Sequence, residues 1–399
     1  MPLSFTSSKI ESIPFAGIRK VFDKAAQMDS KGIKVIHFEI GRPDFDTPKH
    51  IKDAAKSALD QGMVHYTRNA GIPSLRKAIA ASIKLFKKVE YDPMKEIIAT
   101  GGGQQAMFLT LQSILNSGDE VLVPNPGYPQ FTSCVTMCGA TPIPVPLVQE
   151  NNFAPDLLAA QKLISQNTRA IIVNSPHNPT GGVLTRSQII EICNFAEKND
   201  LLIFSDEAYD RILYDNEFVS PAAIDKMKKR TVIWGSLSKT YAMTGWRIGY
   251  IAAPAELVSN AIKVQQNLML SLCSFAQAGA AAGLDGPQDV VDNMTSKFME
   301  RRRIILDGIS DTPGLSCPVI PQGAFYVFVA HKVPGMNSEQ LADRILDEVG
   351  VATVPGSYFG SKGEGFLRIS YAASKEDCQE GMARIKNIMS LLMKEQPSS

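Results

Sequence analysis

Short apolar runs alternate with helix-length amphipathic segments through the middle of the chain. Runs rich in valine, isoleucine and leucine occupy residues 96–100, 120–124, 169–174, 200–206 and 230–234, and each has the length of a buried strand. Segments such as 104–115 and 187–199 repeat their apolar residues at helical spacing. Strands that alternate with helices in this way predict a parallel sheet wrapped by helices.

The pattern of the C-terminal part is different. Residues 323–329 and 365–370 alternate like strands, while 338–349 and 375–392 carry the periodicity of helices. Residues 41–48 (GRPDFDTP) are rich in turn-forming residues and are typical of a crossover between domains. We therefore expect a large α/β domain over residues 48–290 and a smaller α+β domain made of residues 1–47 and 291–399.

Ligands of open parallel sheets bind outside the carboxyl ends of the strands. In this chain, polar or glycine-rich segments follow the predicted strands at 101–103, 125–128, 175–181, 206–209 and 235–239. We expect these segments to meet at one edge of the sheet. Their convergence predicts one large binding site.

Composition and charge narrow the classes of partner. The chain has 399 residues with 41 Lys and Arg against 40 Asp and Glu, which gives no electrostatic reason to expect nucleic acid or an anionic membrane. The N-terminus lacks the pattern of a secretory signal, and polar residues interrupt the apolar stretch 260–284, which predicts core helices and no membrane span. No metal-ligand cluster is visible, and Cys134 and Cys138 read as small buried hydrophobes. We expect a cytoplasmic protein.

Lys239 stands at a strand end between small hydroxyl residues, in the segment 235–250 (GSLSKTYAMTGWRIGY). Burial of a lysine at such a place lowers the pKa of its amine and favours imine formation with an aldehyde. Ser236 and Arg247 in the same segment are suited to bind a phosphate, Arg247 through its bidentate fork. An exposed loop lysine is the alternative interpretation.

Asp206 ends an apolar strand, and a lone buried carboxylate requires a cationic partner. A protonated pyridine nitrogen meets that need, and the pairing keeps the ring an electron sink for carbanion chemistry. Tyr209 and the amide of Asn178, in the turn 174–181 (NSPHNPTG), are candidates to donate to a phenolic oxygen of the same ring. An aspartate that caps the next helix is the alternative interpretation.

Two further positions suit anions. The glycines at 101–103 precede a helix that starts near Gln104, and their amides can cradle a phosphate, although a tight strand-to-helix turn gives the same pattern. Their spacing matches neither the dinucleotide nor the P-loop fingerprint. Arg368 lies inside a short apolar strand, where an arginine needs an anion such as a substrate α-carboxylate or the acidic partner of an internal salt bridge.

Taken together, these segments resemble the aspartate-aminotransferase-like class I/II family of fold-type I enzymes, which depend on pyridoxal 5′-phosphate (PLP). The matching stretches follow the family's order over nearly the whole chain: GRPDFDTP, HYTRNAGIPSLR, NPGYP, NSPHNPTGG, SDEAYD, SLSKTYAMTGWRIGY, QGAFYVF, VPGSYFG and FLRISYA. The resemblance implies an α/β fold whose large domain holds a mainly parallel seven-stranded sheet, with a smaller α+β domain beside it. It also implies an enzyme that moves an amino group from an L-α-amino acid to a 2-oxo acid through pyridoxamine phosphate.

The resemblance further implies a role for each candidate residue. Lys239 would form the Schiff base with PLP and then move the α-proton, while Asp206 would pair with the ring nitrogen and Tyr209 would bind the ring hydroxyl. The other cofactor-binding positions would be Gly103, Gln104, Tyr128, Asn178, Ser236, Ser238 and Arg247, together with Tyr66 from a neighbouring subunit. Gly41, Asn178 and Arg368 would hold the substrate carboxylate. Because Tyr66 would act across an interface, the resemblance implies a homodimer.

One departure and two alternatives leave the reaction open. Several aspartate-using relatives carry a lysine directly after the phosphate-loop glycines, whereas this chain has Gln104, which favours neutral or aromatic substrates over aspartate. Another PLP reaction on the same scaffold, such as β- or γ-elimination, replacement or cyclisation, would use the same Lys239, Asp206 and Arg368. A regulator that binds PLP without catalysis is less compatible with a chain that retains Lys239.

Overall fold

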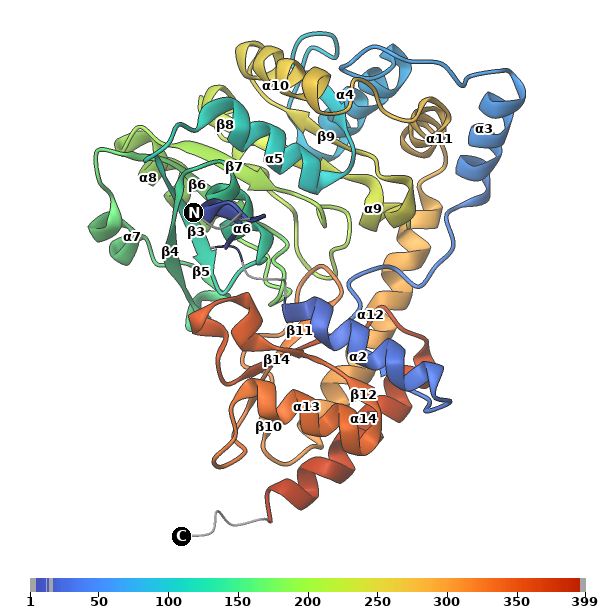
Figure 1. Cartoon of the computed structure of the whole chain (residues 1–399), viewed down its shortest axis with the longest axis vertical. Coiled ribbons are helices and arrows are strands. Elements are labelled where there is room, and N and C mark those ends of the chain that lie inside the picture. The colour runs from blue at the N-terminus through green and yellow to red at the C-terminus, as the bar shows by residue number, and fades with distance from the viewer. Residues whose placement is uncertain (1–4, 12, 14–16, 395–399) are drawn as a thin grey trace.

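Two larger β-sheets and a two-stranded one organise the computed structural model, which describes residues 5–11, 13 and 17–394. The larger sheet lies in the upper part of Figure 1 and the smaller one in the lower part. The strands of the larger sheet are β2 (Ile97–Thr100), β3 (Glu120–Asn125), β4 (Thr141–Val148), β5 (Ala154–Pro155), β6 (Thr168–Asn174), β7 (Leu202–Asp206), β8 (Thr231–Ser236) and β9 (Gly249–Ala252).

The larger sheet has the order β2-β9-β8-β7-β6-β3-β4-β5. The strands from β8 to β4 pair in parallel, while β9 runs antiparallel to both of its neighbours. The mainly parallel seven-stranded sheet is therefore present, with the two-residue strand β5 added at the edge of β4. The carboxyl ends of β3, β6, β7 and β8 point to one edge of the sheet, which is where the polar segments of the sequence were expected to meet.

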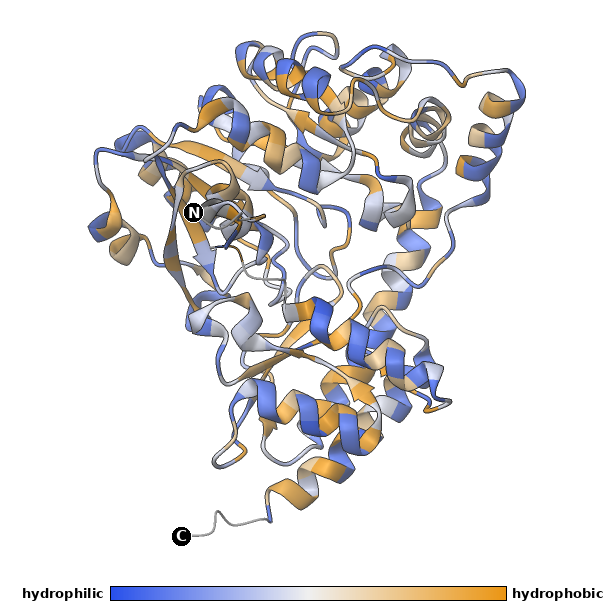
Figure 2. Ribbon diagram, in the orientation of Figure 1, coloured by the Kyte–Doolittle hydropathy of each residue, from blue (hydrophilic) through white to orange (hydrophobic). Residues whose placement is uncertain are grey.

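Alternate residues of each strand face opposite layers of helices. On β8, Val232 and Trp234 pack in a core with α5, α6 and α10, while Ile233 packs on the other face with α4 and α11. Figure 2 shows the strands mostly in the hydrophobic colour and the surrounding helices with one apolar and one polar side. The helices of this upper part are α3 (Lys49–Asp60), α4 (Pro73–Lys87), α5 (Gly103–Ile114), α6 (Gln130–Met137), α7 (Leu157–Leu163), α8 (Arg186–Lys198), α9 (Leu237–Thr240), α10 (Ala255–Leu268) and α11 (Ser274–Asp285).

The smaller sheet has the order β10-β11-β14-β13 and is antiparallel. Its strands are β10 (Leu315–Ser316), β11 (Tyr326–His331), β13 (Val354–Pro355) and β14 (Phe366–Ser370). The helices around it are α12 (Asp289–Ser310), α13 (Ser338–Val349) and α14 (Lys375–Leu392). Long α12 joins both parts, because its Val291 packs in the upper core and its Phe298 and Ile305 in the lower one.

The N-terminal segment lies against the smaller sheet. Strand β1 (Ile36–His37) pairs in parallel with β12 (Val351–Ala352), and α2 (Gly17–Ser30) contacts β12 and β13. The short helix α1 (Ser8–Glu11) contacts α6 of the upper part. The division into a domain of residues 48–290 and a second one of 1–47 and 291–399 stays a prediction.

Two predicted strands begin two or more residues later than expected, for reasons that are local to the backbone. The strand predicted at 200–206 begins at Leu202, because Asp200 takes a left-handed φ of 50° and completes the C-terminus of α8. The strand predicted at 323–329 runs instead from Tyr326 to His331. Ala324, with a φ of 57°, hydrogen-bonds to the loop at Ile212 and breaks the alternation.

The apolar stretch 260–284 forms parts of two helices, α10 and α11, separated by a turn in which Leu270 has a φ of 59°. Within the described residues, no helix combines the length and the apolar character that a membrane crossing requires. Cys134 on α6 and Cys138 directly after it are both buried, as expected of small hydrophobes.

Candidate active site

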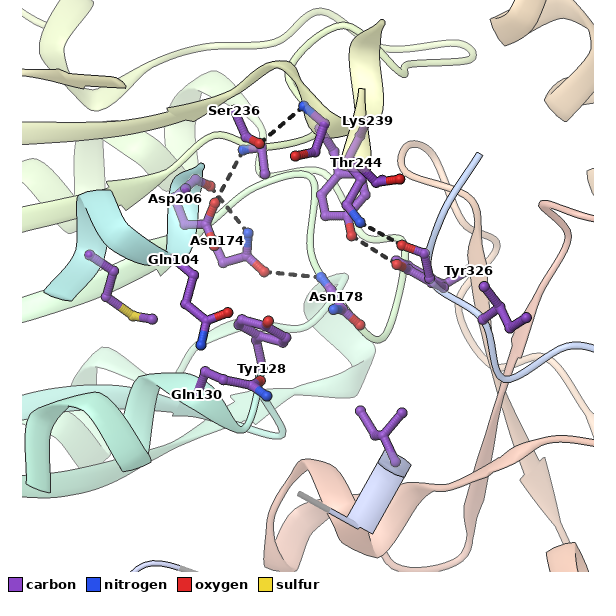
Figure 3. Close-up of a pocket in the computed structure, with 18 of the residues that line it drawn as sticks. Gln104, Tyr128, Gln130, Asn174, Asn178, Asp206, Ser236, Lys239, Thr244 and Tyr326 are labelled. Carbon is purple, nitrogen blue, oxygen red and sulfur yellow. Dashed lines mark hydrogen bonds between the residues drawn. The ribbon is translucent and has the colours of Figure 1, made fainter. Parts of the chain in front are cut away.

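A cavity of about 650 Å³ opens at the carboxyl edge of the larger sheet, and residues of α2 and of the smaller sheet complete its lining. Figure 3 shows the side chains that several elements contribute to it. Every candidate site residue of the sequence lines this cavity except Tyr66; these residues are Gly41, Gly103, Gln104, Tyr128, Asn178, Asp206, Tyr209, Ser236, Ser238, Lys239, Arg247 and Arg368. Segments that are distant in sequence therefore form one site.

Lys239 enters the cavity from α9, the single turn that follows β8. Its Nζ donates a hydrogen bond to the Gly41 carbonyl, which ties the lysine to the crossover at the end of β1. Burial lowers the pKa of the Lys239 amine to about 8, and the positive charges of Arg368 and Arg247 act in the same direction. The amine is therefore partly neutral near physiological pH, and the alternative of a solvated loop lysine does not hold.

Asp206 stands at the end of β7, next to β8, and two strands, β8 and β9, separate it from β2 and the glycines that follow β2. Its Oδ1 accepts a hydrogen bond of 3.1 Å from the Ala208 amide. Burial raises the pKa of this carboxyl to about 7. In the part of the chain that the structure describes, no salt bridge joins Asp206 to a cationic side chain, so its negative charge is open to a cation in the cavity.

An anion site lies at the start of α5. Gly102 has a φ of 91°, and a Cβ there would lie 2.6 Å from Nη2 of Arg247, so the loop requires glycine at this position. Arg247 donates to the carbonyls of Gly101 and Thr244 at 3.2 and 3.0 Å, which holds its guanidinium beside the helix terminus. The first amides of α5, the Ser236 hydroxyl and Arg247 therefore converge on one end of the cavity, an arrangement suited to a phosphate.

Arg368 forms a second anion site at the opposite side. It is 2% exposed on β14 and lies over the ring of Tyr326, with its guanidinium carbon 4.5 Å from the ring centroid. Its Nη1 donates to Oδ1 of Asn178 at 3.3 Å and its Nη2 to the Glu39 carbonyl at 2.6 Å, while its buried Nε has no partner. Among the described residues it forms no salt bridge, so the internal ion pair considered from the sequence is absent and an external anion fits.

Tyrosine and amide side chains surround the space between the two anion sites. The Tyr209 and Tyr326 hydroxyls are hydrogen-bonded at 2.8 Å, and both rings are buried. The backbone N–H of Asn178 donates to Oδ1 of Asn174 at 3.0 Å, and the side-chain oxygen of Asn178 accepts from Arg368. The side-chain NH₂ of Asn178 is left to donate into the cavity. Figure 3 shows Tyr128 beside Gln104 and Gln130 on the far wall.

Several lining residues were not singled out from the sequence, notably Asn174, Gln130, Trp234 and Tyr326. Tyr326 lies in the apolar strand β11, and a tyrosine hydroxyl buried there needs a hydrogen-bond partner. This need is the feature of the sequence that could have identified Tyr326 as a site residue. Tyr66, by contrast, lies outside the cavity on the loop between α3 and α4 and is 83% exposed.

A buried ion cluster lies directly behind Asp206. Lys87, the last residue of α4, forms salt bridges with Glu207 at 2.6 Å and with Asp210 at 2.5 Å. Ser205 and Ser220 donate to the other oxygen of Glu207. Burial alone would lower the pKa of Lys87, but the Asp210 and Glu207 carboxylates outweigh it and raise this pKa above its usual value. The cluster fixes the segment that carries both Asp206 and Tyr209.

The comparisons with known proteins agree with this arrangement. The family model of class I and II aminotransferases matches residues 33–385. The aspartate aminotransferase of Pyrococcus abyssi is 39% identical over 96% of this chain and 98% of its own length. The aromatic-amino-acid aminotransferase 2 of Thermococcus litoralis is 37% identical, with 96% of this chain and 98% of that protein covered.

A solved structure extends the likeness to three dimensions. The aspartate aminotransferase of Thermus thermophilus with maleate superimposes with a TM-score of 0.92 at 33% identity, and the superposition covers 97% of this chain and 100% of that one. The expected fold type I is thereby confirmed. The family model and the relatives both extend over nearly the whole chain, so this protein belongs to the class I and II aminotransferase family and is an amino-acid aminotransferase.

Proposed function

We propose that this aminotransferase works with PLP bound in the cavity, covalently attached to Lys239. The observation that carries the proposal is a partly neutral amine, with a pKa of about 8, in one cavity with a half-buried carboxyl that has no cationic partner among the described residues. An aldehyde suits the amine and a protonated pyridine nitrogen suits the carboxyl. When bound, PLP supplies an aldehyde for imine formation and a ring that stabilises negative charge at the substrate's α-carbon.

The remaining cofactor contacts follow from the donors around the cavity. The amides of Gly103 and Gln104, the hydroxyls of Ser236 and Ser238, and the Arg247 guanidinium would hold the phosphate. Tyr209 and the Asn178 amide would donate to the ring hydroxyl, and Tyr128 would stack on the ring. Each of these groups is a hydrogen-bond donor or an aromatic face, which is the chemistry that a phosphorylated pyridine requires.

Lys239 would also move the proton of the reaction. The neutral form of its amine would accept the proton from the substrate's α-carbon, and the ammonium form would hold this proton for delivery to the cofactor, which keeps the amino group. A pKa near 8 keeps both forms populated at physiological pH, which favours transfer in both directions. Asp206, as a carboxylate, stabilises positive charge at the ring nitrogen while this proton moves.

The substrate carboxylate would be bound by Arg368, with help from Asn178 and the Gly41 backbone. Arg368 is buried without an acidic partner, and its Nε lacks a hydrogen bond. A carboxylate in this place would satisfy the guanidinium through two parallel hydrogen bonds. Since every α-amino acid and 2-oxo acid carries such a carboxylate, this contact would serve both half-reactions.

Arg368→Ala is expected to weaken the binding of an unreactive carboxylate, such as 3-phenylpropionate, by about 100-fold or more, the loss of charge-assisted hydrogen bonds worth roughly 3 kcal/mol. The dissociation constant is measured by calorimetry on the PLP-loaded protein. Arg19→Ala is the control, because Arg19 lines the same cavity but is 69% exposed and paired with Asp23. Equal losses in the two variants would contradict the role of Arg368.

A homodimer would complete the site with Tyr66 of the partner subunit. Arg247 lines both the active-site cavity and a separate apolar hollow, whose walls include Leu59, Trp246, Leu272 and Phe275. A second copy seated over that hollow would reach the phosphate end of the cavity. Tyr66 and its neighbour Val64 are exposed, as a residue that acts in a partner's site must be.

A neutral or aromatic amino acid would be the preferred substrate. The lining of the cavity includes the apolar side chains of Ile18, Phe22, Ile40 and Met107 together with the uncharged amides of Gln104 and Gln130. Arg19, a further cation of the lining, is paired with Asp23 at 2.9 Å. The relatives include enzymes named for aspartate and for aromatic amino acids, and the apolar part of the lining favours the second group.

A panel of amino acids tests the proposal. The purified protein is loaded with PLP and mixed with each common amino acid, while absorbance reports conversion of the cofactor to its amine form and chromatography reports the 2-oxo acid. Phenylalanine, tyrosine, leucine or methionine should react faster than aspartate. Release of ammonia without conversion of the cofactor would indicate elimination, and the absence of PLP binding would refute the proposal.

A further inference from the structure

Tyr326 lies between the two halves of the site, on β11 of the smaller sheet. Its ring is 1% exposed and lies under the guanidinium of Arg368 at 4.5 Å. Its hydroxyl meets the hydroxyl of Tyr209 at 2.8 Å. Tyr326 thus contacts both the residue proposed for the substrate carboxylate and the residue proposed for the ring hydroxyl.

The position of the Tyr326 hydroxyl is fixed by its surroundings. A Cβ on Gly41 would lie 2.6 Å from this oxygen, so the Gly41 backbone passes directly beside it. The Tyr209 ring packs edge-on against the Tyr326 ring, with centroids 5.7 Å apart. A buried hydroxyl held in this way has Tyr209 as its hydrogen-bond partner among the described residues, and breaking that bond would leave both phenols unsatisfied.

The direction of this hydrogen bond follows from the task proposed for Tyr209. If Tyr209 donates its own proton to the ring hydroxyl of the cofactor, it cannot donate to Tyr326 as well. The proton between the two phenols must then come from Tyr326. A phenol that accepts one hydrogen bond becomes a stronger donor in the next, because the two bonds polarise each other.

The positive charge of Arg368 acts in the same direction. A cation over an aromatic ring withdraws electron density from it, which makes the Tyr326 hydroxyl a stronger donor. The groups around Tyr326 that carry or exchange protons are Arg368 on β14, Tyr209 after β7, Asp206 on β7, Lys239 on α9, Tyr128 after β3 and Tyr371 after β14. Of these, Tyr209 is the one that shares a hydrogen bond with the Tyr326 hydroxyl.

We propose that Tyr326 is a positioning residue that donates to Tyr209 and thereby strengthens the hydrogen bond from Tyr209 to the cofactor's ring hydroxyl. The inference rests on the proposed binding of PLP to Lys239. A stronger hydrogen bond at the ring hydroxyl stabilises its anionic form, so the bound cofactor releases its proton at a lower pH. Tyr326 thus links the acidity of the cofactor to the residue that binds the substrate carboxylate.

The test compares the wild type with Tyr326→Phe, Tyr209→Phe and the double variant, all loaded with PLP. The readout is the pH midpoint of the cofactor's absorbance change, which requires no turnover. Tyr326→Phe should raise the midpoint by roughly half a pH unit to one pH unit, the equivalent of one hydrogen bond's net worth. Tyr209→Phe should raise it further, and the double variant should match Tyr209→Phe, because Tyr326 acts through Tyr209.

The controls separate this role from a purely structural one. Tyr326→Phe keeps the ring under Arg368, so the dissociation constant for 3-phenylpropionate should not change. An unchanged midpoint in Tyr326→Phe beside a raised one in Tyr209→Phe would overturn the inference, as would shifts that simply add in the double variant. A wild type that binds no PLP would instead refute the proposed function and this inference with it.

Discussion

Replacing Lys239 by alanine is expected to lower turnover by at least about a thousandfold, because the variant loses both the amine that would hold the cofactor and the base that would move the α-proton. The side chain enters the cavity from α9 and is held by the Gly41 carbonyl. Its pKa is lowered to about 8 by burial and by Arg368 and Arg247. Few lysines combine a position inside a cavity with an amine that is partly neutral at physiological pH.

Lys239→Arg makes the same test sharper. The variant keeps a cation at this position, but a guanidinium does not form an imine and does not lose its proton in this pH range. Turnover should therefore be lost in both variants. Covalent attachment is measured separately, by borohydride reduction and mass spectrometry, and in the wild type the peptide with Lys239 should carry the mass of the cofactor.

The control for these variants is Lys162→Ala, which removes an exposed lysine of α7 away from the cavity. This variant should keep full turnover and full attachment of the cofactor. Attachment that survives in Lys239→Ala would mean that another amine holds PLP. Turnover close to that of the wild type in Lys239→Arg would rule out imine formation at this residue.

Much of the fold and of the site could be predicted from the sequence, because the decisive signals are local. The boundaries of α13 and α14 were predicted to the residue, since Asn337 and Ser374 cap their first turns and the apolar periodicity runs to the last residue. The residues at the carboxyl ends of β6, β7 and β8 were placed at one edge by the parallel order of the strands alone.

Other parts carried no local signal. Strand β4 has prolines at positions 142, 144 and 146, which argue against a central strand; it forms because the missing N–H groups all fall on the side away from β3. The start of β11 could not be predicted, since Ala324 leaves the strand conformation only to bond with the loop at Ile212. The contact of Tyr326 with Tyr209 joins residues that are 117 positions apart.

Replacing Lys87 by methionine is expected to lower the free energy of unfolding by about 3–5 kcal/mol, the usual cost of removing one partner from a buried ion pair. The Lys87 and Glu207 side chains are 2% and 1% exposed, and Asp210 is 12% exposed. Methionine fills a similar volume, so the loss is that of charge and hydrogen bonds rather than of packing. Two carboxylates would then share a buried site without a cation.

Two controls test this explanation in urea unfolding experiments. Lys84 lies on α4 like Lys87, but it forms an exposed ion pair with Glu90. Lys84→Met removes the cation of this pair, and the unfolding midpoint should stay close to that of the wild type. Lys87→Met combined with Glu207→Gln and Asp210→Asn should regain much of the lost stability, because the uncompensated charges are gone. If Lys87→Met unfolds at the same urea concentration as Lys84→Met, the ion cluster does not stabilise the segment that carries Asp206 and Tyr209. The hydrogen bonds from Ser205 and Ser220 to Glu207 would then be the contacts that hold Glu207 in place.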